Sequence, residues 1–382
     1  MINYPSSKLP DIGTSIFTVM SALANAHKAI NLSQGFPDFN CPAPLIELVH
    51  AYMLQGFNQY APMAGVPKLR ENISLKTEKL YGYLPDADTE VTVTSGATEA
   101  LNAAITAVVK TGDEVLLLEP CYDSYAPVIR LCGGVPVYVP LALPDFSVDW
   151  DLVKRRISTR TRLILINTPH NPTGAVMTKQ DMDMLANLLE GTDTLVISDE
   201  VYEHMVFDGQ QHYSALQHPQ LRKRSIVISS FGKTYHTTGW KIGYAVAPAP
   251  LTAELRKMHQ FITFSTPTPL QMALADFLEE EAHYLQLPDF YQAKRDFFLE
   301  QMKGSRFELI PSAGTYFQLA KYNNISDEYD LDFAKRMTKE TGVAAIPVSA
   351  FYHDKTDHKY LRFCFAKGEE TLQAAAEKLV RL

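Results

Sequence analysis

The segment Ser225-Ile226-Val227-Ile228-Ser229-Ser230-Phe231-Gly232-Lys233-Thr234-Tyr235 joins a short apolar run to a lysine that lies among small residues. The run at 225–229 predicts a buried strand. A lysine delivered by the end of a buried strand loses hydration, which lowers its pKa and makes its amine a usable nucleophile. Lys233 is therefore a candidate for forming a Schiff base. A surface lysine after an edge strand would show the same local pattern, so other parts of the chain have to decide between the two.

Further apolar runs surround this segment and indicate the fold class. Between about residues 88 and 248 they alternate with amphipathic stretches and lie at 90–94, 114–118, 135–139, 162–167, 194–198, 225–229 and 242–246. Strands that are apolar throughout are buried on both faces, which is typical of a mostly parallel sheet covered by helices. Apolar residues at helical spacing predict a helix over 97–110, and the capping-box spacing of Thr178 and Asp181 predicts a crossover helix that runs to about Leu189.

The chain is long enough for two domains. Its 382 residues exceed what one hydrophobic core usually organises. After about residue 280 the pattern changes to helices near 288–302 and 327–340, with short strands at 315–319 and 360–364. We therefore expect an α/β fold with a large domain and a smaller α/β domain.

The predicted large domain covers 45–280, and the small domain combines an N-terminal arm, 1–44, with 281–382. Proline-rich stretches near 37–44 and 267–269 are interpreted as bends at the junction.

Composition excludes several classes of function. Charged residues make up 20% and hydrophobic ones 46% of the chain, and no apolar stretch is long enough to cross a bilayer, so no membrane partner is expected. The net charge of −8 disfavours nucleic acid as a partner. The start of the chain lacks the features of a secretory signal, and the four scattered cysteines fit a reducing compartment, so we expect a cytoplasmic protein. The histidines His170, His204 and His236 lack a metal-ligand spacing, so no metal is assigned.

An aldehyde cofactor on Lys233 with a pyridine ring would need an anion at its ring nitrogen. Asp199 closes the apolar run at 194–198, at the carboxyl end of a strand, where open α/β sheets bind ligands. There it could keep the ring protonated, so that the ring acts as an electron sink. An ordinary loop acid or helix cap remains the alternative for Asp199.

A phosphate handle on the same cofactor would need a helix N-terminus. The segment 94–100, Thr94-Ser95-Gly96-Ala97-Thr98-Glu99-Ala100, joins a strand to a predicted helix. Its backbone N–H groups and the Thr98 hydroxyl meet where the helix dipole favours an anion. The segment matches neither GxGxxG nor a Walker loop, and a plain capped helix start fits it equally well.

Four other residues are candidates for contacts in such a site. Asn171 and Tyr202 could donate hydrogen bonds to a phenolate oxygen, although Asn-Pro is also a common turn. Tyr122 could stack on a flat ring, although it could equally be packing. The guanidinium of Arg362 could hold a carboxylate through two parallel bonds, and a surface salt bridge is the alternative.

Taken together, four motifs strongly resemble the class I pyridoxal-phosphate aminotransferases. In chain order they are Ser95-Gly96-Ala97-Thr98-Glu99-Ala100, Asn167-Thr168-Pro169-His170-Asn171-Pro172-Thr173-Gly174, Asp199-Glu200-Val201-Tyr202 and Ser230-Phe231-Gly232-Lys233-Thr234. The runs at 32–38, 59–62 and 238–243 are similar to those of the methionine aminotransferase and kynurenine (glutamine) aminotransferase subgroup. The resemblance covers nearly the whole chain and implies the fold type I of these enzymes, with a mostly parallel seven-stranded sheet in the large domain.

The resemblance also implies a role for each matched residue and pyridoxal 5′-phosphate as the cofactor. Lys233 would carry the cofactor and shuttle a proton, with Asp199 and Tyr202 as further catalytic residues. The cofactor would be held by Gly96, Ala97, Thr98, Tyr122, Asn171, Asp199, Tyr202, Ser230, Lys233 and Lys241, and by Tyr60 from the partner subunit of a homodimer. The substrate carboxylate would be held by Gly35, Asn171 and Arg362. Many relatives have arginine where Lys241 stands, and a lysine supplies a point charge in its place.

The expected reaction is ping-pong transfer of an amino group to a 2-oxo acid. The family would place Ile16, Phe17, Tyr60, Tyr122 and Phe264 near the substrate, and this apolar wall suits methionine, aromatic amino acids, kynurenine or glutamine better than aspartate. A carbon-sulfur β-lyase on the same fold is the main alternative. A cofactor-sensing regulator would need a DNA-binding domain ahead of residue 30, which disfavours that reading.

Overall fold

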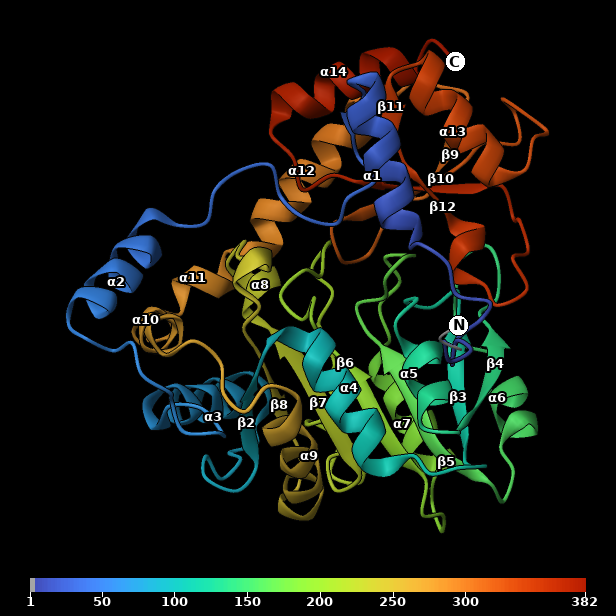
Figure 1. Cartoon of the computed structure of the whole chain (residues 1–382). Helices are drawn as coiled ribbons and strands as arrows, with labels where there is room; N and C mark the ends of the chain where they lie inside the picture. Colours follow the sequence, from blue (N-terminus) through green and yellow to red (C-terminus); the bar gives the residue numbers. More distant parts are fainter. Residues whose placement is uncertain (1–3) are drawn as a thin grey trace.

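The computed structural model describes residues 4–382 and is organised around two β-sheets (Figure 1). The larger sheet has seven strands in the order β2-β8-β7-β6-β5-β3-β4. Their bounds are β2 Val91–Thr94, β3 Glu114–Glu119, β4 Val135–Pro140, β5 Thr161–Asn167, β6 Leu195–Asp199, β7 Ser225–Ser230 and β8 Gly243–Val246. All neighbours pair in parallel except β8, which is antiparallel to both β2 and β7. The prediction of seven strands in a mostly parallel sheet is confirmed.

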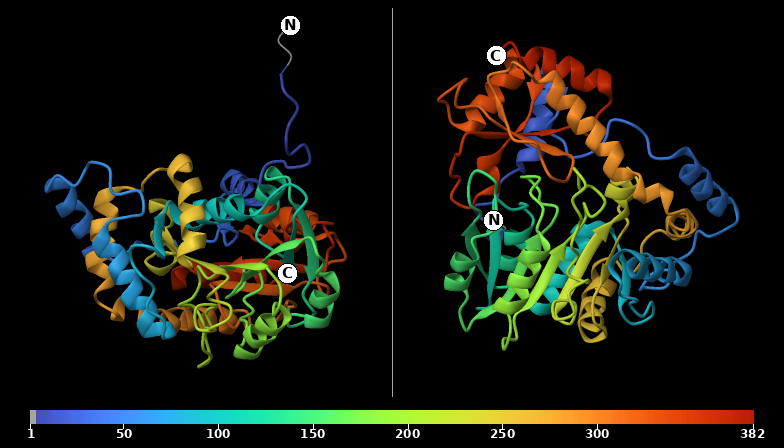
Figure 2. Two further views of the ribbon diagram at one scale, coloured as in Figure 1. Left: turned by 90° about the horizontal axis from the view of Figure 1, so that it is seen from below. Right: turned by 180° about the vertical axis from the view of Figure 1, so that it is seen from behind.

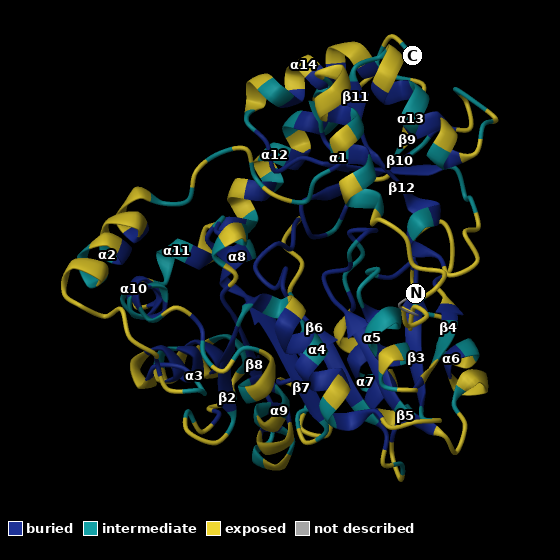
Figure 3. Cartoon of the chain, in the orientation of Figure 1, coloured by how far each residue is buried: buried dark blue, intermediate teal, exposed yellow. Residues whose placement is uncertain are grey.

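Helices cover both faces of this sheet, which explains why its strands are apolar throughout. Alternate strand residues point to opposite faces. One set, including Leu117 and Leu165, packs with α4 (Gly96–Val108), α5 (Tyr125–Leu131) and α9 (Ala249–Ile262). The other set, including Leu116 and Ile164, packs with residues of α3 (Pro67–Tyr81), α6 (Trp150–Arg156) and α7 (Lys179–Leu188). The strands therefore form the buried centre of this layer (Figure 3).

The edge strand β4 departs from the expected burial. Val135 is exposed, and only Val139 of this strand is fully buried. β4 is exposed because it lies at the edge of the sheet and has a single neighbouring strand. The apolar run at 135–139 does not indicate that the strand lies at an edge.

The predicted capping box is present, because Thr178 and Asp181 bond each other's backbone N–H at the start of α7.

The smaller sheet has the order β12-β13-β10-β9. Its strands are β9 Glu308–Leu309, β10 Phe317–Lys321, β12 Ile346–Pro347 and β13 Tyr360–Cys364, and the helices beside it are α1 Ile16–His27, α12 Leu287–Gln301, α13 Asp330–Glu340 and α14 Glu369–Leu379. The helices expected near 288–302 and 327–340 and the strand at 360–364 are confirmed. β10 begins two residues later than expected, because Thr315 has a φ of 66° and forms a turn ahead of it.

Segments near both ends of the chain, α1 and the C-terminal elements, contribute to the upper layer in Figure 1. β1 (Ile30–Asn31) pairs in parallel with β11 (Val343–Ala344), so α1 lies beside α13 although some 300 residues separate them (Figure 2). This pairing fits a small domain built from both chain ends. The limits 45–280 and 281–382 stay a prediction.

The remaining helices flank the large sheet and include α2 Ala43–Leu54, α8 Phe231–Thr234, α10 Thr268–Leu278 and α11 Ala282–Leu285, with 3₁₀ turns η1 Thr238–Trp240 and η2 Val348–Phe351. The proline-rich stretches interpreted as bends start helices, since Pro42 and Pro267 are the N-caps of α2 and α10. Within residues 4–382, every helix is too short or too polar to cross a bilayer.

Candidate active site

The carboxyl ends of the central strands meet at one edge of the large sheet, and a pocket opens there. β5 ends at Asn167, β6 at Asp199 and β7 at Ser230, and the chain enters α4 directly after β2. Ligands of open α/β sheets bind at this edge. Ten of the predicted site residues line this pocket: Gly96, Ala97, Thr98, Tyr122, Asn171, Asp199, Tyr202, Ser230, Lys233 and Lys241.

Lys233 lies on the short helix α8 at the end of β7, and its amine is turned into the protein. Nζ donates to the Tyr316 hydroxyl at 2.7 Å and to the Gly35 carbonyl at 3.2 Å. Burial lowers the pKa of Lys233 to about 8, and the charges of Arg362 and Lys241 act in the same direction. The amine is therefore neutral for much of the time at mildly alkaline pH, as a nucleophile requires. The alternative of an exposed surface lysine is wrong.

Asp199 is a buried carboxylate with one strong donor. Its Oδ2 accepts from the Tyr125 hydroxyl at 2.7 Å, and its side chain is shielded from solvent at the end of β6. Burial raises the pKa of Asp199 to about 6, while the bond from Tyr125 opposes the shift. At neutral pH the group is an anion with little competing solvation, which is what a protonated ring nitrogen would pair with.

Arg362 is the most deeply buried cation of the site. On β13 it is 1% exposed, its Nη1 donates to Asn171 Oδ1 at 2.7 Å, and its Nη2 donates to the Ser33 carbonyl at 3.1 Å. Its Nε is buried without a hydrogen-bond partner. No carboxylate of the described residues pairs with it, so the alternative of a surface salt bridge is wrong. A buried guanidinium with a free donor fits an incoming carboxylate.

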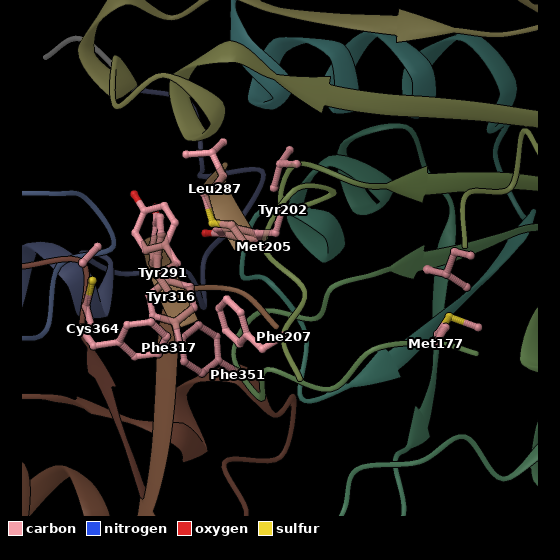
Figure 4. Close-up of a cluster of buried hydrophobic side chains, with 14 of the residues drawn as sticks. Met177, Tyr202, Met205, Phe207, Leu287, Tyr291, Tyr316, Phe317, Phe351 and Cys364 are labelled. Atoms are coloured by element: carbon pink, nitrogen blue, oxygen red, sulfur yellow. The ribbon is translucent and has the colours of Figure 1, made fainter. Parts of the chain in front are cut away.

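Aromatic rings surround this guanidinium. Its carbon lies 3.8 Å from the Phe317 ring centre and 5.3 Å from those of Phe17 and Phe351. The rings of Tyr202 and Tyr316 meet edge to face at 5.1 Å beside Phe317, and Figure 4 shows these three side chains packed together. Arg362 and its apolar surroundings thus lie beside the pocket, joined to it through Asn171.

The start of α4 forms a cradle with Lys241. A Cβ added at Gly96 would lie 3.5 Å from Lys241 Nζ, so the amine faces the first turn of the helix. The Ser95 side chain makes no capping hydrogen bond to α4. The first N–H groups of a helix have no partner inside it, and here they remain available to an anion.

Tyr60 and Phe264, two rings expected near the substrate, lie away from the pocket. Tyr60 is 84% exposed and packs edge to face on Phe264 at 5.4 Å. Tyr60 lines a different hollow, between residues 58–60 and 265–269. Within one chain, therefore, neither ring contacts Lys233 or Arg362.

Sequence reasoning missed three residues that contact the predicted ones. They are Tyr125, which binds Asp199; Tyr316, which binds Lys233; and Asn167, whose Oδ1 accepts from the Asn171 N–H at 2.8 Å. Asn167 was within a recognised motif and ends a predicted strand, so its position was a usable signal. Tyr316 comes from the distant small sheet, and no local pattern marks it.

The comparisons with known proteins cover nearly the full chain. Residues 27–379 match the family described as aminotransferase class I and II. The chain belongs to this family.

Individual relatives agree with the family. This aminotransferase is 56% identical over 379 residues to the methionine aminotransferase of Escherichia coli (strain K12), covering 99% of this chain and 98% of that one. It is 35% identical over 418 residues to the kynurenine–oxoglutarate transaminase of Dictyostelium discoideum, covering 99% and 96%. The solved structure of YbdL from Escherichia coli, which identifies a methionine aminotransferase function, superposes with a TM-score of 0.98 at 56% identity over all of both chains.

Class I aminotransferases use pyridoxal 5′-phosphate, and the pocket of this aminotransferase fits that cofactor. It holds an amine of lowered pKa, a buried carboxylate and an anion cradle. These are the groups that an aldehyde, a ring nitrogen and a phosphate require.

Lys233 of the cofactor-free chain should react with acetic anhydride at far lower pH than surface lysines do. Because its pKa is lowered to about 8, the labelling rate should reach half of its maximum near pH 8, against about pH 10.4 for exposed amines. Mass spectrometry of peptides labelled at graded pH measures this, with the 73% exposed Lys303 as internal reference. Identical profiles for the two lysines would refute the desolvated amine.

Gly243→Ala should disturb the anion cradle. The new Cβ would lie 2.7 Å from the Ser229 oxygen and 2.9 Å from both the Ala97 nitrogen and the Gly96 carbonyl carbon. Because these are backbone atoms, β8 must move away from α4, at a cost of about 1–3 kcal/mol in stability. We expect about tenfold weaker binding of pyridoxal 5′-phosphate by equilibrium titration. Gly239→Ala, which adds its Cβ in open space, is the control and should leave affinity unchanged.

Proposed function

We propose that this enzyme transfers the amino group of methionine, and of other amino acids with neutral side chains, to a 2-oxo acid by a ping-pong mechanism. The observation that carries the proposal is the 56% identity over the full chain with a methionine aminotransferase. The pocket supports it, because the cation Arg362 is surrounded by the rings of Phe17, Phe317 and Phe351. Aromatic amino acids, kynurenine and glutamine are the further donors that this wall suits.

The cofactor contacts follow from the positions of the side chains. The aldehyde and electron-withdrawing ring of pyridoxal 5′-phosphate supply the amino-group acceptor and the electron sink. Lys233 would bind the aldehyde, Asp199 the ring nitrogen, and Asn171 and Tyr202 the phenolate oxygen, with Tyr122 stacked on the ring. The phosphate would be held by Gly96, Ala97, Thr98, Ser230 and Lys241.

The chain's own groups would bind the substrate and move one proton. Arg362 would bind the substrate carboxylate through its free Nε and a terminal nitrogen, with Asn171 and Gly35 beside it. The free Lys233 amine would take the proton from the substrate Cα. Its pKa of about 8 lies near neutral pH, so the amine can both accept this proton and release it again. Asp199 would stay ionised throughout and hold the ring proton.

We also propose a cytoplasmic homodimer in which Tyr60 of one subunit completes the cofactor site of the other. The support is local: Tyr60 is 84% exposed, lines a hollow other than its own chain's pocket, and packs on the exposed ring of Phe264. Exposed apolar side chains of this kind favour an interface.

A panel of amino donors against several 2-oxo acids tests the proposed activity. Methionine and phenylalanine should be converted at least about tenfold more efficiently than aspartate, because the apolar wall offers no second cation for a side-chain carboxylate.

Lys233→Ala should lose multiple turnover, and near-normal turnover in that variant would rule out the assignment. Pyruvate and ammonia formed from a cysteine conjugate without a 2-oxo acid would favour β-elimination instead.

Arg362→Ala should raise the KM of every amino donor by about a hundredfold, whatever its side chain. The reason is the loss of a charge-assisted pair of hydrogen bonds to the carboxylate that all donors share, worth about 3 kcal/mol. Steady-state kinetics with methionine and phenylalanine measure the effect. Arg336→Ala removes an arginine that binds Glu328 on the surface, and it should leave both KM values unchanged. A selective loss for one donor would contradict the carboxylate role.

Sedimentation equilibrium should give a molar mass of about twice the 42.8 kDa of one chain. In the same samples Tyr60→Phe should weaken binding of pyridoxal 5′-phosphate by a few fold, since one hydrogen bond contributes about 1 kcal/mol. A monomer that binds cofactor with wild-type affinity would exclude the shared site.

A further inference from the structure

An acidic residue lies in the first turn of the helix that would receive the phosphate. Glu99 of α4 is only 8% exposed, and its Oε2 accepts from the Ser95 N–H at 3.0 Å. Glu99 lines a hollow that Ser95, Thr98 and Lys241 also line. A carboxylate in this position would repel a phosphate dianion. The site requires something that removes this negative charge.

His259 on α9 is placed to do so. It is 0% exposed, and its Nδ1 lies 3.0 Å from Glu99 Oε1, while its Nε2 lies 3.0 Å from the Met63 carbonyl oxygen. The three hydrogen bonds form one chain, from the Ser95 N–H through Glu99 and His259 to Met63. Met63 follows Tyr60 by three residues, so the chain joins the start of α4 to the segment proposed to reach the partner subunit.

The number of protons in this chain fixes the net charge of the pair. A carbonyl oxygen only accepts, so Nε2 of His259 must carry a proton. One further proton lies between Nδ1 and Oε1, because two acceptors at 3.0 Å would not form a hydrogen bond. If that proton belongs to histidine, the pair is a cation with an anion; if it belongs to glutamate, both groups are neutral. The net charge of the pair is zero in either case.

We propose that His259 is a positioning residue for cofactor binding, which neutralises Glu99 and through it fixes the Ser95 turn, so that the start of α4 can hold the cofactor phosphate. This inference rests on the proposed phosphate site. Glu99 alone would orient Ser95 at the cost of a negative charge. With His259 the same hydrogen bond to Ser95 is kept without a net negative charge beside the phosphate site.

Binding of pyridoxal 5′-phosphate and of pyridoxal to the cofactor-free full chain tests the proposal without relying on activity. The ratio used is the dissociation constant of pyridoxal divided by that of pyridoxal 5′-phosphate. The hemiacetal that free pyridoxal forms affects every variant equally, so a change in this ratio between variants reports the phosphate site. His259→Gln keeps a hydrogen-bonding side chain but supplies no shared proton, so Glu99 becomes charged. In this variant the dissociation constant of pyridoxal 5′-phosphate should rise about tenfold, so the ratio falls about tenfold. The dissociation constant of pyridoxal should stay within about threefold of the wild-type value.

Two further variants separate charge from structure. In Glu99→Gln/His259→Gln the charge is gone and the two amides can bond each other, so the ratio should return to within about threefold of wild type. Glu99→Gln alone keeps the bonds to Ser95 and His259 without a charge and should also retain the wild-type ratio. Thr252→Val is the matched control: Thr252 is a buried residue of the same helix whose hydroxyl bonds the Ala247 carbonyl at 2.9 Å. It should lower the melting temperature without changing the ratio.

The outcomes are distinguishable. A wild-type ratio in His259→Gln, or a lowered one in Glu99→Gln, would overturn the role of His259. Equal affinity of the wild-type chain for the two probes would instead overturn the proposed phosphate site itself.

Discussion

Removal of water from a few charged side chains at the carboxyl edge of the large sheet is the constraint on which this structure depends. Burial raises the pKa of Asp199 to about 6 and lowers those of Lys233 and Arg362 to about 8 and about 10. Each shift reflects the free energy that a charge loses when it leaves water. The fold tolerates this because each group has a placed hydrogen-bond partner: Tyr125 for Asp199, Tyr316 for Lys233 and Asn171 for Arg362.

A second set of buried charges supports the same edge from behind. At the end of β6 and in the turn after it, Asp199 and Tyr202 line the pocket, whereas Glu200 and Glu203 do not and belong to a polar network. Glu203 bonds Lys76 on α3 at 2.7 Å, and Glu200 bonds His212 at 2.9 Å and Ser198 at 2.7 Å. A buried ion pair adds little net stability, but breaking it is costly, so it fixes one arrangement of the chain. The two glutamates thereby hold the turn that presents the pocket residues.

The small sheet completes the pocket with residues remote in sequence. Arg362 on β13 contacts Asn171 after β5 and Ser33 near β1, and Tyr316 contacts both Lys233 and Gly35. The guanidinium proposed to bind the substrate and the amine proposed to bind the cofactor thus come from different layers, joined through contacts between them. The apolar rings on Arg362 lower its hydration further and leave a carboxylate as the natural partner of its free Nε.

The sequence by itself determined the seven strands and the motifs at their ends, and it marked Lys233 and Asp199 as candidate site residues. Those features depend on local patterns: apolar runs, turn residues and the position of a polar side chain after a strand. Only the tertiary structure decided which residues contact them, because those contacts join segments far apart. In sequence, Tyr125 is 74 positions from Asp199 and Tyr316 is 83 positions from Lys233. Glu99 and His259, which bind each other, are 160 positions apart. The sequence likewise did not predict the exposure of β4 or the separation of Tyr60 from the pocket. An apolar run or an aromatic residue does not indicate which residues lie next to it in space.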